Sequence, residues 1–185
     1  RTHPLTTDRI ADMQDRARTV PSRNVSTAIE FYFIKARARL EQAGGTSSMY
    51  DLKNTFDSLS KQAQIGKQLE GFYGLALIEQ RQGKWDQAEA DLQQARNLMQ
   101  KAGAPGSPIQ RQSLSLDITA SELALAKGKK EEALQIAQAA LRANPQSYAA
   151  AVAMINAELK MGRTNDVIAW LKARTKAQPN EVLWW

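Results

Sequence analysis

The stretch LSLDITASELALAKGKKEEALQIAQAALRANPQS, residues 114–147, decides the fold of this chain. Three of its landmarks return 34 residues later: Gly128, Ala133 and Pro145 return as Gly162, Val167 and Pro179. An earlier part of the chain has the same spacing, at Gly83, Ala88 and Ala95. Glycine and proline mark helix ends, so the period predicts helix pairs. Because one pair cannot bury its apolar faces alone, the pairs are expected to stack into a solenoid.

This period and its small residues resemble the tetratricopeptide repeat, a 34-residue unit of two antiparallel helices. The resemblance implies an all-α fold, a tetratricopeptide-repeat α-solenoid with an N-terminal helical extension. We place three repeats at residues 69–102, 114–147 and 148–181, with a longer loop between the first two. The third repeat has Ile155, Val167 and Arg174 where closely paired helices need small residues. We therefore expect looser packing there.

The remaining segments are also predicted to be helical. Residues 1–23 hold an apolar stripe that ends at Pro21, which predicts one helix. Two further stripes, ending near Gly44 and beginning near Ser47, predict a degenerate helical hairpin over residues 24–68. Residues 182–185 restart the period, and we interpret them as the start of a truncated further helix.

Composition excludes several classes of protein. The chain has 185 residues, 43% of them hydrophobic, so it can bury a core, and it has no apolar run long enough to cross a bilayer. It has no cysteine, which excludes disulfides and thiolate metal sites but leaves the compartment open. The net charge is +6, but charges of both signs alternate along the helices, so we expect no nucleic-acid partner. In the densest basic cluster, Lys35 and Arg39 share a helix face that Arg37 does not.

Catalytic patterns are missing from this sequence. His3 is the single histidine and there is no cysteine, so we expect no Ser/His/Asp set in a suitable geometry, and the two-histidine HExxH zinc motif is absent. Carboxylate pairs such as Glu131 and Glu132 lie on solvent-facing helix positions by periodicity. We therefore expect no catalytic residue and no cofactor in this part of the protein.

The beginning of the chain carries a more specific signal. Thr2, His3 and Pro4, followed by Arg9 and Ile10, form a THP-x-x-x-x-R-I stretch. It resembles the end of the catalytic domain in BepA-like periplasmic HExxH zinc metallopeptidases, which carry carboxy-terminal tetratricopeptide repeats. The likeness continues through residues 12–18, 30–37 and 73–77. It implies that residues 1–23 are a linker helix from an upstream catalytic domain, that zinc and the HExxH site belong to the parent protein, and that His3 lies near that zinc only in the intact parent. In this chain alone, His3 is better interpreted as a loose terminal residue.

The tetratricopeptide resemblance also implies a binding groove. In such folds the first helix of each pair lines the concave face. The corresponding residues here are Glu70, Tyr73, Leu77, Gln80, Arg81, Ile118, Glu122, Val152, Asn156 and Lys160. This set is apolar with scattered charges, which favours a peptide helix or an extended segment as ligand. Packing against a neighbouring repeat explains Tyr73, Leu77 and Ile118 equally well.

These observations leave three hypotheses for function. The first is a non-catalytic interaction domain of a periplasmic zinc metalloprotease, recruiting outer-membrane protein substrates or their assembly machinery. The second is a free-standing tetratricopeptide scaffold with no protease attached. The third, a basic solenoid that binds RNA, predicts retention of RNA that falls steeply with salt.

Overall fold

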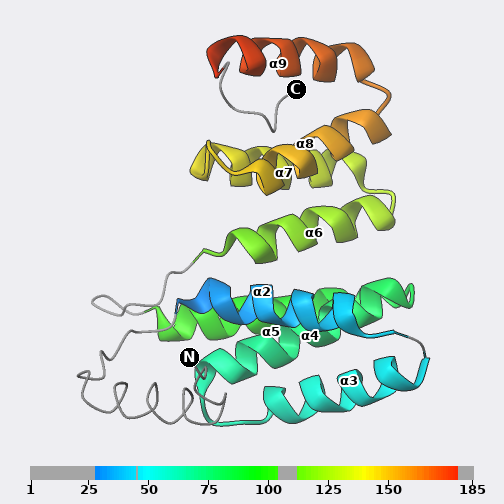
Figure 1. Ribbon diagram of the computed structural model, residues 1–185, viewed down its shortest axis with the longest axis vertical. Coiled ribbons are helices and arrows are strands. Elements are labelled where there is room, and N and C mark those ends of the chain that lie inside the picture. The colour runs from blue at the N-terminus through cyan, green and yellow to red at the C-terminus, as the bar shows by residue number, and fades with distance from the viewer. Residues whose placement is uncertain (1–27, 45, 104–111, 179–185) are drawn as a thin grey trace, which may run out of the picture.

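The computed structural model describes residues 28–44, 46–103 and 112–178, and all structural statements here refer to them. Within these ranges lie eight helices and no strand. The helices are α2 (Ile29–Gln42), α3 (Thr46–Ser60), α4 (Ile65–Arg81), α5 (Trp85–Ala102), α6 (Leu114–Ala126), α7 (Lys130–Ala143), α8 (Tyr148–Lys160) and α9 (Thr164–Ala177). They stack along one axis from α3 to α9 (Figure 1), which confirms the all-α repeat solenoid. The helices predicted in residues 1–23 and 182–185 lie outside the described residues.

The three predicted repeats correspond to the pairs α4–α5, α6–α7 and α8–α9, and each pair turns on a glycine. Gly83, Gly128 and Gly162 have φ values of 71°, 77° and 79°, a region that residues with a Cβ seldom adopt. After each glycine the next amide donates to a carbonyl five residues back, as from Lys129 N to Ala124 O at 2.9 Å. This bond satisfies a carbonyl that the helix end leaves free. The turn positions expected from the period are confirmed.

The helix pairs close on small residues, as the period predicts. Ala88 and Ala95 are buried in the first pair, and Ser121, Ala133 and Ala140 in the second. The third pair differs, because Val167 is the only residue of α9 classed as buried. α8 and α9 contact each other much less than the helices of the other two pairs do, and the expected loose packing is observed.

The segment 24–68 differs from the predicted hairpin. Its two described helices, α2 and α3, scarcely touch each other, and both pack on α4. Glycines on α4 make room for α3: a Cβ added at Gly74 would lie 2.4 Å from the ring of Phe56, and one added at Gly71 would lie 2.3 Å from the backbone nitrogen of Ser60. Apolar periodicity located both helices but did not specify which helix each would cover.

None of the helices in the described ranges is both long and apolar enough to cross a membrane.

Candidate binding groove

The helix α2 covers the inner face of the first repeat. Phe33, Ala36 and Leu40 of α2 are buried in the same core cluster as residues of α4. Beneath them, Glu70 and Tyr73 have no exposed surface. The prediction that these two residues line an open groove is therefore wrong, because α2 occupies the space that a ligand would need.

The buried carboxylate of Glu70 is neutralised by two cations of α2. Lys35 Nζ lies 3.1 Å from Glu70 Oε2, and Arg39 Nη1 lies 3.2 Å from Glu70 Oε1. A buried charge without a partner would be strongly destabilising, so these two contacts hold α2 in register on α4. The shared helix face of Lys35 and Arg39, predicted from their spacing, is used for this one carboxylate.

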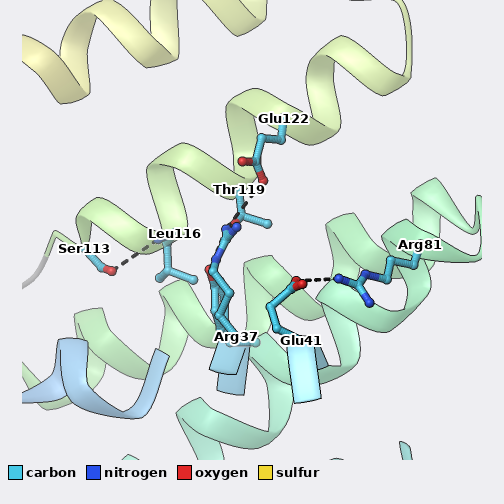
Figure 2. A network of polar contacts seen from close by, with 8 residues as sticks. Arg37, Glu41, Arg81, Ser113, Leu116, Thr119 and Glu122 are labelled. Carbon is cyan, nitrogen blue, oxygen red and sulfur yellow. Dashed lines mark hydrogen bonds and ion pairs between the residues drawn. The ribbon is translucent and has the colours of Figure 1, made fainter. Parts of the chain in front are cut away.

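Arg37 points to a different set of partners and links three helices. Figure 2 shows its guanidinium reaching from α2 toward Thr119 and Glu122 of α6. Nη2 donates to Thr119 Oγ1 at 2.8 Å and to the Tyr73 hydroxyl of α4 at 3.0 Å, and it lies 3.5 Å from Glu122 Oε2. Burial raises the pKa of Tyr73, although Arg37 and Thr119 oppose this shift. The phenol therefore stays neutral, and Arg37 fixes α2 against both α4 and α6.

An open groove of about 770 Å³ lies beyond this network, between α2, α6 and α8. Four of the predicted residues line it: Ile118, Glu122, Val152 and Asn156. Its apolar surface includes Ile34 of α2 and Tyr148 of α8, which are 64% and 47% exposed. Glu30 also lines it from α2. The sequence analysis did not include the residues of α2 among those that line the groove. One signal was present: Ile34 is apolar but lies outside the apolar stripe of that helix, which indicates a second apolar contact surface.

A smaller hollow of about 330 Å³ lies between α2, α4 and α6. Three predicted residues of α4 line it: Leu77, which is largely buried, Gln80 and Arg81. Arg81 is paired with Glu41 of α2 (Figure 2). Because Arg37 and Glu122 line both hollows, their ion pair lies between the two. Lys160 is exposed and lines neither hollow.

Charged groups on the larger groove are mostly acidic. Glu30 accepts a hydrogen bond of 2.6 Å from Ser115, and Asp117 pairs with Arg96 at 3.0 Å. Burial raises the pKa of Asp117, Arg96 opposes the shift and the negative charge of Glu30 adds to it. The groove thus combines an apolar floor with side chains that form hydrogen bonds, a composition suited to holding a polypeptide.

Metal chemistry finds no support in this part of the chain. Among the described residues, no group of three or more His, Asp or Glu side chains is arranged to hold a metal ion. His3, the residue that the resemblance puts near zinc, lies outside those residues.

Comparison with known families agrees with this architecture. Two tetratricopeptide-repeat models match the chain, one over residues 68–146 and the other over residues 124–185. Together they span residues 68–185, and this part of the chain is a tetratricopeptide-repeat domain. Such repeats act in general as protein-interaction modules without catalytic activity of their own.

Proposed function

We propose that this chain is the protein-binding domain of a periplasmic zinc metalloprotease and that it recruits outer-membrane proteins or their assembly machinery. The observation that carries the binding role is the open groove between α2, α6 and α8, which has exposed apolar residues in a module of a protein-binding family. The stretch from Thr2 to Ile10 supports the link to a protease. Catalysis and zinc belong to the upstream domain in this proposal, and the repeats supply substrate capture.

The binding role is tested by photocrosslinking in cells. A photoreactive amino acid replaces Ile118 or Val152 in the groove, and the matched control replaces Gln135, which is exposed on α7 and lines no hollow described above. We expect adducts that contain outer-membrane β-barrel proteins or their assembly factors from positions 118 and 152. Adducts from position 135 alone would contradict the groove assignment.

The protease link is tested separately from the binding role. We expect the reading frame upstream of Arg1 to encode an HExxH motif within about 150 residues, the size of one domain. A start codon close to Arg1, with no such motif, would favour a free-standing scaffold. The groove would keep its binding role in that case.

A further inference from the structure

One face of α2 presents an acidic, an apolar and a basic side chain to the groove between α2, α6 and α8. Glu30, Ile34 and Arg37 follow one another at spacings of four and three residues, so they lie on one side of the helix, and all three line the groove. Glu30 contacts Ser115 near the start of α6, and Arg37 contacts Thr119 one turn further along. The two helices therefore run in the same direction, and the exposed Ile34 lies between the two charged groups along the groove.

The charges that line the groove leave one carboxylate without a cation. Two ion pairs account for the other charged groups: Arg37 with Glu122 at 3.5 Å and Asp117 with Arg96 at 3.0 Å. Among the described residues, Glu30 has no partner of opposite charge; it accepts one hydrogen bond, of 2.6 Å, from Ser115. Its place in the first turn of α2 favours a negative charge but does not neutralise it. The groove therefore keeps an unbalanced negative charge at the end where α2 begins.

This arrangement is complementary to a cation next to an apolar side chain. A carboxylate has two oxygens that accept several hydrogen bonds, so Glu30 can bind a lysine or an arginine while it keeps the bond from Ser115. Ile34 follows four residues later, about 6 Å along the helix, and Ile118 of α6 lines the same groove. Alternate residues of an extended chain point the same way and lie about 7 Å apart. A basic and an apolar residue two positions apart would reach both places.

The polar side chains of the groove favour an extended ligand over a helical one. Gln112 and Asn156 are exposed and line the groove. A side-chain amide both donates and accepts hydrogen bonds, as a peptide group does. An extended segment leaves its backbone groups free for such bonds, whereas a helix uses nearly all of them internally.

We propose that the groove selects extended segments of other proteins that carry a lysine or arginine two residues from a large apolar residue. The cation binds Glu30, and the apolar side chain packs against Ile34 and Ile118. This selectivity rests on the binding role proposed above and adds the chemistry of the ligand to it.

The first test compares two short synthetic peptides by fluorescence anisotropy. One carries an arginine two residues from a leucine, and the other has glutamine in place of the arginine. We expect the arginine peptide to bind about fivefold more tightly, the effect of one partly exposed ion pair. Added salt should reduce this preference, because it screens exposed charges. Equal affinities, or no binding of either peptide, would overturn the proposal.

The second test changes the carboxylate. Glu30→Gln should bind both peptides alike, with the affinity that the unaltered chain has for the glutamine peptide. Glu30→Lys should instead prefer a third peptide that has glutamate in place of the arginine. The matched control is Glu131→Gln, which makes the same change in net charge at an exposed position of α7 that lines no hollow described above. It should keep the preference for arginine. Equal loss of the preference in Glu30→Gln and Glu131→Gln would show a general charge effect and exclude the site.

Failure of the selectivity differs from failure of the proposed function. Crosslinks to partner proteins from positions 118 and 152, together with equal binding of the peptides, would leave the groove its binding role and overturn the charge selection. Sedimentation of the chain alone tests another occupant. If the chain forms dimers that Glu30→Gln dissociates, a second copy fills the groove, and the proposal is overturned.

Discussion

The second and third repeats have the same turn but different helix packing. In both, a serine caps the first helix: Ser113 accepts the amide of Leu116 at 3.3 Å, and Ser147 accepts that of Ala150 at 3.2 Å. Gly128 and Gly162 have nearly the same φ. Yet α8 and α9 contact each other much less than α6 and α7 do, and α9 buries one residue, whereas α7, which α8 also covers, buries four. Caps and turns therefore establish the connection between two helices, and they do not determine how closely the helices pack.

The difference arises at the positions where the helices meet. In the second repeat the Ser121 hydroxyl donates to the backbone oxygen of Ala133 at 2.9 Å, a contact possible only when the two backbones lie close. At the equivalent positions of the third repeat stand Ile155 and Val167. Larger side chains at such positions are expected to prevent close approach of two backbones, which agrees with the reduced contact between α8 and α9.

The strongest way to break the second repeat is to give it the large residue of the third. Ala140 is buried, and its equivalent in the third repeat is Arg174. Ala140→Arg forces a charge between α6 and α7, and we expect a loss of about 4–5 kcal/mol in the free energy of unfolding. Urea denaturation followed by circular dichroism measures it. Arg174→Ala is the reciprocal control and should change stability by less than about 1 kcal/mol. Comparable losses from both variants would show that the contact positions do not cause the difference.

A matched pair of truncations sharpens the comparison. Leu134 and Ile168 occupy the same repeat position, but Leu134 is 6% exposed and Ile168 is 44% exposed. Leu134→Ala should lower the free energy of unfolding by about 3 kcal/mol, because it removes buried carbons and leaves a cavity. Ile168→Ala should lower it by no more than about 0.5 kcal/mol. Chemical denaturation measures the loss in the free energy of unfolding for each variant. The loss for Leu134→Ala should be several times the loss for Ile168→Ala.

The turns, where the two repeats agree, are expected to show a smaller effect than Ala140→Arg or Leu134→Ala. A Cβ added at Gly128 or Gly162 meets no atom within 4 Å, so the cost of Gly→Ala is backbone strain alone. We expect about 1–2 kcal/mol at each position. Thermal unfolding measures this cost for the Gly128→Ala variant. Hydrogen exchange in α9 measures it for the Gly162→Ala variant. A much smaller effect at either position would mean that its turn relaxes to another conformation.

Local patterns in the sequence predicted most of the fold. Glycine marked the turns between paired helices, and the large residues at 155 and 167 predicted the loose third repeat, because these effects act over a few residues. The sequence did not predict that α2 would lie over the first repeat. Its apolar stripe shows that the helix is amphipathic, and the choice of α4 as its partner depends on contacts far apart in the chain, such as that of Lys35 with Glu70.

For the same reason, the sequence predicted only part of the candidate site. Ile118, Glu122, Val152 and Asn156 follow from the repeat register and do line the groove. Glu70 and Tyr73 have the same register in the first repeat, but a helix from outside the repeats covers them. The repeat register predicts the face of the helix from which a side chain points. It does not predict whether another helix covers that face.

The contact of α2 with α6 makes this solenoid less modular than its period implies. In a simple repeat array each unit touches only its neighbours, so units can be added, removed or unfolded one at a time. Here Arg37 ties a helix that precedes the first repeat to the second repeat, so α2, α4 and α6 must assemble together. A repeat inserted between α5 and α6 would separate Arg37 from Thr119 and Glu122. The array can therefore be extended beyond α7 far more readily than within its first half.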